Sequence, residues 1–213
     1  MIKIYDSSTT LDAIAADSTN GLGWIENIDG EVNEELNGLY EAVFTVSDEA
    51  NHFSDLQIGG IVGITTTEGD QLFRIYFIST PIDHIVEVRC QHITYDMLKI
   101  AVEPFTATGI SELMDGLENN VIGGTYPFTF STDLSNTSSV YTLTIPRSQR
   151  ECLGGYQGSV LDVFACEYKW DNLNVEILSR RGSDQGVWIA YGKNLTEFTN
   201  EENIEDVYTA VLG

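Results

Sequence analysis

Hydrophobic and polar positions alternate in short runs along the first hundred residues. The run at residues 39–46 shows this most clearly, because Glu41 and Thr45 separate apolar positions. Such alternation predicts a β-strand with one buried face. The residues predicted to lie on that face are Tyr40, Ala42, Phe44 and Val46. Further strands are predicted at residues 2–5, 23–28, 60–65, 71–80 and 85–93.

Short strands with a turn signal about every ten residues are typical of a β-sandwich or barrel. We therefore predict a β-rich, barrel- or sandwich-like domain over residues 1–100.

The pattern changes after Pro104. A short helix is predicted over residues 108–119, because apolar residues recur there at the i, i+3, i+4 and i+7 spacing of one helix face. These residues are Ile110, Leu113, Met114 and Leu117. A strand is predicted at residues 141–147. A second helix is predicted to begin at Ser159, since Asp162 follows it at the spacing of a capping box.

The sequence pattern of residues 167–192 predicts a three-stranded β-meander. Its strands would be residues 167–171, 173–179 and 186–192, joined by turns at Asp171–Asn172 and at Gly182–Gly186. The predicted fold class is α+β and β-rich, with a smaller α+β domain over residues 101–213 that carries short helices on the meander.

Charge narrows the range of functions. The 213 residues carry 10 Lys and Arg against 33 Asp and Glu, a formal net charge of −23. Binding to DNA or RNA phosphates needs a surplus of basic residues, so a simple nucleic-acid-binding role is excluded. The acidic surface serves either solubility or the repulsion of polyanions. Residues 147–193 are locally neutral, with six bases and six acids.

Cysteine usage and hydropathy indicate a protein made in the cytosol. The three cysteines, Cys90, Cys152 and Cys166, form no CxxC pair, which favours reduced thiols. The first ten residues lack the apolar region of a signal peptide, and no run reaches the length of a membrane span. We expect no membrane anchor.

Signatures of catalysis, metals and cofactors are missing from the sequence. His52, His84 and His92 fit no HExxH or HxH pattern, and neither GxSxG nor a phosphate-binding loop occurs. His92, in a predicted strand, is expected to be a hydrogen-bonded core or edge residue. We predict no catalytic residue, no metal site and no cofactor.

Eight motifs, in order, are similar to a known family. They are LNGLYEAVFTV (36–46), QLFRIYFIS (71–79), HITYDML (92–98), LGGYQGSVLD (153–162), EYKWDN (167–172), RRG (180–182), YGKNL (191–195) and VYTAVL (207–212). The chain resembles the N-terminal region of phage minor structural proteins, also called prophage tail proteins or tail-associated lysins, of the baseplate hub family.

The resemblance implies a β-rich homotrimer in the virion tail, made in the cytoplasm of the bacterial host. Each subunit would contribute barrel-like domains to a ring that extends the tail tube, and DNA would pass through its lumen without specific binding. An acidic lumen would suit that passage. Other tail proteins, such as the distal tail protein and the tape measure protein, are the implied partners.

Longer relatives continue past the position of Leu212 into further domains, some of which degrade cell wall. We therefore expect a truncated or unusually short chain, without enzymatic activity in these residues. Such a chain is expected to be able to remain monomeric in solution.

The neutral run contains the candidate structural or interface residues. They are Trp170, Asp171, Asn172, Arg180, Arg181, Gly182, Tyr191, Gly192, Lys193 and Asn194. Trp170 would anchor a strand pair, and Asp171 and Asn172 would form a tight turn by bonding their own backbone. Arg180 and Arg181 would pair with the chain's own carboxylates, within or between subunits. An internal fold anchor and a contact between subunits or domains both stay open.

Two other functions stay open as alternatives. One is a fragment of a cell-wall hydrolase, either a peptidoglycan endopeptidase or a glycosidase, whose catalytic carboxylates cannot be singled out. The other is a module that binds host-surface carbohydrate through Trp24, Trp170 and Trp188. Because these tryptophans lie in separate predicted strands, we expect core residues and not a shared sugar platform.

Overall fold

The computed structural model describes residues 1–16, 19–26, 28–124, 126–135, 138–184, 186, 188 and 190–193. Two compact units divide the chain, Met1–Arg181 and Gly182–Gly213. The first unit holds every named helix and strand of the described residues. Among those helices, none is long and apolar enough to cross a membrane.

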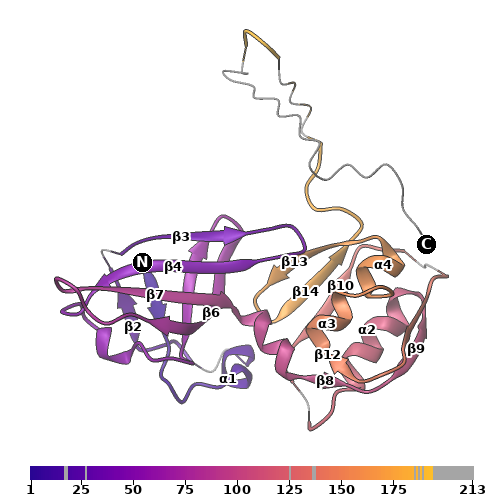
Figure 1. The fold of residues 1–213 in the computed structure, drawn as a ribbon, viewed down its shortest axis with the longest axis horizontal. Coiled ribbons are helices and arrows are strands. Elements are labelled where there is room, and N and C mark those ends of the chain that lie inside the picture. The colour runs from indigo at the N-terminus through magenta and orange to yellow at the C-terminus, as the bar shows by residue number, and fades with distance from the viewer. Residues whose placement is uncertain are drawn as a thin grey trace, which may run out of the picture. The chain divides into compact units, whose positions relative to one another are not determined.

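A curled seven-stranded antiparallel sheet forms the N-terminal part of the first unit (Figure 1). Its strand order is β2-β1-β5-β6-β7-β4-β3. The strands are β1 (Ile2–Ile4), β2 (Gly23–Ile25), β3 (Asp29–Glu34), β4 (Tyr40–Ser47), β5 (Ile61–Thr66), β6 (Gly69–Ile78) and β7 (Ile85–His92). Three short helices accompany them, α1 (Leu11–Ala15), η1 (Phe53–Asp55) and η2 (Ile93–Lys99). The predicted β-rich class is confirmed.

Alternation along β4 gives the burial that the sequence predicts. Its buried residues are Tyr40, Ala42, Phe44 and Val46. The edge strand β3 was not predicted as a separate strand, because DGEVNE has one apolar residue, Val32, in six positions. Backbone pairing with β4 holds it in place, with Val32 opposite Ala42.

The C-terminal part of the first unit combines short helices with three small sheets. Its strands are β8 (Ala101–Val102), β9 (Phe105–Thr108), β10 (Thr129–Thr132), β11 (Val140–Leu143), β12 (Arg147–Ser148), β13 (Glu167–Asp171) and β14 (Asn174–Leu178). Its helices are α2 (Gly109–Asn119), α3 (Gln149–Leu153) and α4 (Val160–Phe164). Figure 1 shows β13 and β14 between the seven-stranded sheet and these helices.

The predicted meander is wrong in its third strand. The hairpin of β13 and β14 forms as expected, but the third strand of the sheet is β10, which runs parallel to β14. Residues 186–192 belong to the second unit, where Trp188 and Tyr191 are 86% and 93% exposed. Val175 and Ile177 of β14 instead lie opposite Phe130 and Thr132 of β10.

The start of α4 also differs from the prediction. The Ser159 side chain makes no cap hydrogen bond, and Asp162 accepts one from the Gly158 backbone N–H at 2.8 Å. A complete capping box occurs instead at α3. There the Ser148 hydroxyl accepts from the Glu151 N–H, and the Glu151 carboxylate accepts from the Ser148 N–H.

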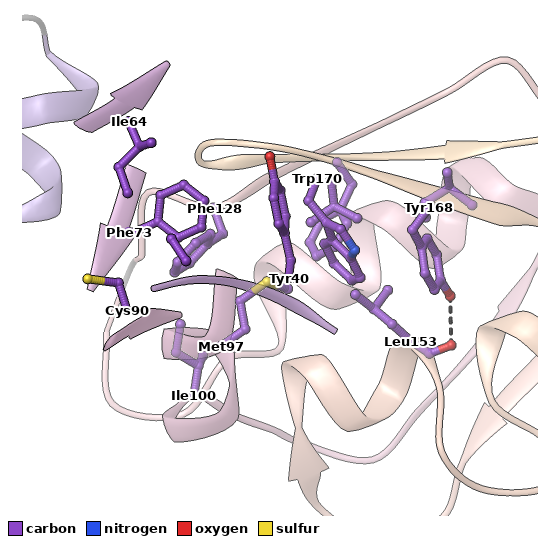
Figure 2. Packing of buried hydrophobic residues seen from close by; sticks show 14 of the residues in the cluster. Tyr40, Ile64, Phe73, Cys90, Met97, Ile100, Phe128, Leu153, Tyr168 and Trp170 are labelled. Atoms are coloured by element: carbon purple, nitrogen blue, oxygen red, sulfur yellow. Dashed lines mark hydrogen bonds between the residues drawn. The ribbon is translucent and has the colours of Figure 1, made fainter. Parts of the chain in front are cut away.

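One hydrophobic cluster includes core residues from both sequence halves. Figure 2 shows Tyr40 and Trp170 in the middle of the drawn residues, with Phe73 and Ile64 on one side and Leu153 and Tyr168 on the other. The division of the chain into domains at residue 100 stays a prediction. The three cysteines are buried free thiols, and burial raises the pKa of each.

Candidate functional site: a motif junction around Arg150

A cavity of about 280 Å³ lies where four of the sequence motifs meet. We call it the Arg150 cavity. Its lining residues are Asn37, Gly38, Tyr95, Arg150, Leu153, Gly154, Gly155, Leu161, Tyr168 and Trp170. All but Arg150 belong to the motifs at residues 36–46, 92–98, 153–162 and 167–172. Segments separated by more than a hundred residues therefore build one site.

Arg150 occupies this junction from helix α3. Its guanidinium carbon lies 4.0 Å from the ring centre of Tyr95 and 4.4 Å from that of Trp170, which is cation–π geometry. Its N–H groups donate to Thr94 Oγ1 at 2.9 Å and to the Gly38 carbonyl oxygen at 3.4 Å. Burial lowers the pKa of this guanidinium below its ordinary value.

Trp170 lies in the core as part of β13. It is 3% exposed, and its ring centre lies 5.3 Å from that of Tyr168. The indole Nε1 is buried, and no described residue accepts a hydrogen bond from it. Figure 2 shows this nitrogen on the side of the ring toward Leu153 and Tyr168, which line the same cavity.

The loop that precedes β4 holds β13 in position. Asn37, at a φ of 59°, accepts a hydrogen bond from the Tyr168 backbone N–H at 2.7 Å through its side-chain oxygen. The Tyr168 hydroxyl donates to the Leu153 carbonyl oxygen at 2.6 Å, drawn as a dashed line in Figure 2. Burial raises the pKa of this phenol well above its ordinary value, so the hydroxyl stays a donor.

A buried chain of hydrogen bonds runs from Arg150 toward the turn after β13. Arg150 donates to Thr94 Oγ1, which lies 2.9 Å from His92 Nδ1. His92 Nε2 lies 3.1 Å from Gln71 Oε1, and Gln71 Nε2 donates to Asp171 Oδ1 at 3.1 Å. An amide oxygen only accepts, so the proton of the neutral imidazole sits on Nε2, and Thr94 donates to Nδ1. Each donor in this chain of hydrogen bonds therefore faces an acceptor.

His92 is the buried centre of this chain. It is 0% exposed and stacks on Tyr40 with ring centres 4.5 Å apart. Burial, with a contribution from the charge of Arg150, lowers the pKa of His92 to about 3. The imidazole is therefore neutral at pH 7. The prediction of a hydrogen-bonded core histidine is confirmed.

The turn at Asp171 and Asn172 bonds to another strand and not only to itself. Asn172, at a φ of 52°, accepts through Oδ1 from the Leu72 backbone N–H at 2.9 Å. Its own N–H donates to Gln71 Oε1 at 2.9 Å. The expectation that these side chains bond their own backbone is therefore corrected. Their main partners lie about a hundred residues earlier, on β6.

Arg181 pairs with a carboxylate of its own chain. Its Nη1 and Nη2 lie 2.5 Å and 3.3 Å from the two oxygens of Glu34, at the end of β3. These hydrogen bonds raise the pKa of Arg181 above its ordinary value. Arg180 is exposed, and none of the described carboxylates lies within ion-pairing distance of it.

The remaining predicted residues lie in the second unit or outside the described residues. Gly182 and Gly192 adopt positive φ values of 76° and 80°. Tyr191 is exposed, and the Lys193 backbone N–H donates to the Ala190 carbonyl oxygen at 3.1 Å. Asn194 lies outside the described residues. Asp171 and Asn172 are hydrogen-bonded to β6 of the seven-stranded sheet, and Trp170 packs in the hydrophobic core. The structure also places Arg181 against Glu34 of that sheet.

Sequence reasoning missed Arg150, Thr94, Gln71 and Glu34. Arg150 carried one usable signal, since it precedes the LGGYQGSVLD motif by three residues and is one of few bases in an acidic chain. The partners of Gln71 and Glu34 lie 100 and 147 residues away, and no local pattern predicts such contacts.

A second cavity, of about 540 Å³, lies between β1, β2, α1 and the β13–β14 turn. We call it the Trp24 cavity. Trp24, Tyr5, Lys3, Asp70 and Asp171 are among its lining residues. Trp24 is 45% exposed there. Of the three tryptophans only Trp170 lies in the core, so the expectation of three core residues is wrong for Trp24 and Trp188.

Comparison with known proteins identifies a shared fold. No family model matches the chain, and no curated protein matches it. The prophage tail protein gp18 from Listeria monocytogenes EGD-e has a similar structure, with a TM-score of 0.54 and 15% identity over 83% of this chain. The E. coli c3393 protein, a type VI secretion component described as similar to T4 tail proteins gp27 and gp5, matches 74% of the chain at a TM-score of 0.40 and 11% identity.

This chain covers 50% and 49% of those two structures, so it spans about half the length of the solved proteins it matches. Over most of its described length, it shares the fold of a prophage tail protein.

Proposed function

We propose that this chain is a structural, non-enzymatic component of a phage or prophage tail tip, in the baseplate hub. The observation that carries the proposal is the fold shared with the prophage tail protein gp18 over 83% of the chain. The eight ordered motifs support the same role, because four of them build one packed junction around Arg150 and Trp170.

The proposed role includes assembly into a homotrimeric ring that extends the tail tube. The distal tail protein and the tape measure protein would contact this ring, and further wall-degrading or host-contact modules would use it as a platform. The formal charge of −23 supports a lumen through which DNA slides without binding, because dense negative charge repels phosphates.

Disruption of the gene in its phage tests the proposed role. We expect particles whose tails lack a complete tip, and complementation should restore the tip in negative-stain images. Normal tails with full infectivity after disruption would contradict a hub role. As a separate check on the absence of catalysis, the purified protein should release no soluble fragments from peptidoglycan.

Glycan binding is a second candidate function, favoured by the Trp24 cavity. The half-exposed Trp24 offers a surface on which a sugar ring can stack. Lys3, Asp70 and Asp171 offer hydrogen-bonding groups in the same cavity. A cavity that combines an exposed aromatic side chain with several polar groups is suited to a saccharide.

A pull-down on purified cell-wall polysaccharide tests this candidate. Trp24→Ala should abolish binding if the cavity takes a glycan, and Trp188→Ala serves as the matched control because Trp188 is exposed and belongs to the second unit. Retention of the wild-type protein that Trp24→Ala does not reduce would rule out the cavity as the site.

A further inference from the structure

Arg150 is a partly buried positive charge that forms no ion pair with any carboxylate of the described residues. No carboxylate of the described residues lies within 4.0 Å of its guanidinium, although the chain carries 33 acids. Three other arginines, Arg74, Arg89 and Arg181, each form an ion pair with an Asp or Glu. Removing a cation from water costs free energy that a counterion normally offsets.

The contacts that Arg150 does make leave hydrogen-bonding capacity at the cavity. Trp170 and Tyr95 contact the guanidinium with their ring faces, and the Tyr95 side chain also acts on it as a hydrogen-bond partner, which partly offsets the lowering of the Arg150 pKa by burial. Thr94 and Gly38 accept from two of its five N–H groups. A planar guanidinium of this kind is suited to bind a carboxylate with two parallel hydrogen bonds.

A second donor at the same cavity lacks an acceptor. Trp170 is 3% exposed, and its Nε1 has no hydrogen-bond partner among the described residues. A buried donor in this state is costly, and native proteins rarely leave one unsatisfied. Arg150 and Trp170 therefore both line a cavity of about 280 Å³, and both carry N–H groups for which the described residues supply no acceptor.

We propose that the Arg150 cavity binds a carboxylate group, held by the guanidinium of Arg150 and the indole N–H of Trp170. A single negative charge matches the one guanidinium. The chain's own charge of −23 disfavours a multivalent anion such as a phosphate, because the surrounding negative field acts on each added charge. The proposal does not depend on the role in a phage tail.

An NMR titration with sodium acetate tests the site. The three tryptophans give three indole N–H signals, and Trp170→Phe identifies the signal of Trp170. With acetate added at constant ionic strength against sodium chloride, the Trp170 signal should shift and saturate, while the other two stay in place. No saturable shift of the Trp170 signal in the wild-type protein would overturn the proposal, and so would an equally tight response to inorganic phosphate.

Variants assign the effect to Arg150. Arg150→Gln should weaken acetate binding roughly tenfold or more, the loss expected when charge-assisted hydrogen bonds are removed. Arg147→Gln is the matched control, because its guanidinium carbon also lies 4.0 Å from a tyrosine ring, that of Tyr156, but outside the cavity. Equal acetate affinity in both variants would contradict the proposal. If Arg150→Gln does not fold, Arg150→Lys, which keeps the charge but loses the planar fork, should also bind acetate more weakly.

Sedimentation velocity then identifies the source of the carboxylate. If an acidic side chain of a second copy fills the site, the wild-type protein self-associates, and both acetate and Arg150→Gln reduce that association. If the natural ligand is a free small carboxylate, the protein sediments alike with and without acetate while the NMR shift remains.

Discussion

At the scale of single residues, the polar core is the feature that local sequence patterns describe least. Gln71, His92 and Thr94 are each at most 1% exposed, yet they sit among apolar strand positions. The sequence supported a hydrogen-bonded His92 but not its partner Gln71, which lies 21 residues earlier. Such partners depend on strand register and packing, which one sequence does not specify.

Burial of neutral His92 predicts a pH dependence of stability. Well above pH 6.5 the imidazole is neutral in both the folded and the unfolded state and contributes no pH dependence. As the pH falls below 6.5, His92 of the unfolded chain binds a proton, whereas His92 of the folded chain stays neutral down to about pH 3. The free energy of unfolding therefore falls with falling pH. Between pH 7 and 5.5, wild type should lose about 1 kcal/mol more than His92→Gln in urea titrations.

Thr106→Ala is the control for this experiment, because Thr106 is exposed and neither it nor its partner Thr142 titrates. It should lose stability over the same pH range as much as the wild-type protein does. A His92→Gln variant with the wild-type pH dependence would contradict the neutral, buried imidazole.

Asn172 gives a second residue-scale prediction. Asn172→Gly keeps the positive φ without strain but removes the acceptor for the buried Leu72 N–H. The free energy of unfolding should fall by about 1–3 kcal/mol. Asn33→Ala, which removes only an exposed bond to Glu31, should change it by less than about 0.5 kcal/mol. Equal losses would show that the turn is not tied to β6.

At the scale of elements, alternation and helical spacing predicted strands and helices well but predicted their neighbours poorly. The strand β4 and the helix α2 lie close to where the pattern placed them. The third strand of the small sheet was misplaced because β10 comes from residues 129–132, far before the hairpin it joins. Parallel pairing needs a long connection, and local turn signals carry no information about it.

The Arg181–Glu34 pair ties the end of β3 to the segment after β14. Both side chains are 19% exposed, and the contact uses both carboxylate oxygens. A double-mutant cycle with Arg181→Gln and Glu34→Gln should give a coupling of about 1 kcal/mol that decreases at high salt. The more exposed pair Arg89–Glu87 should couple more weakly. Equal coupling for the two pairs would contradict a structural role for Arg181.

At the scale of the whole molecule, composition indicated a function more directly than any candidate active site did. The formal charge of −23 argued against simple nucleic-acid binding. The strand patterns predicted a β-rich fold, and the structure shows one. The Arg150 cavity could not be predicted, because its lining comes from four distant segments. The motifs that meet there were visible in the sequence, but their meeting point was not.

The central proposal is that this acidic chain forms a ring in the tail hub through which DNA passes. Cryo-electron microscopy of the tail tip, at a resolution that places side chains, tests it most directly. We predict a threefold ring of this chain whose lumen is lined by carboxylates. A ring with a neutral or basic lumen, or a tail tip that lacks this chain, would contradict the account.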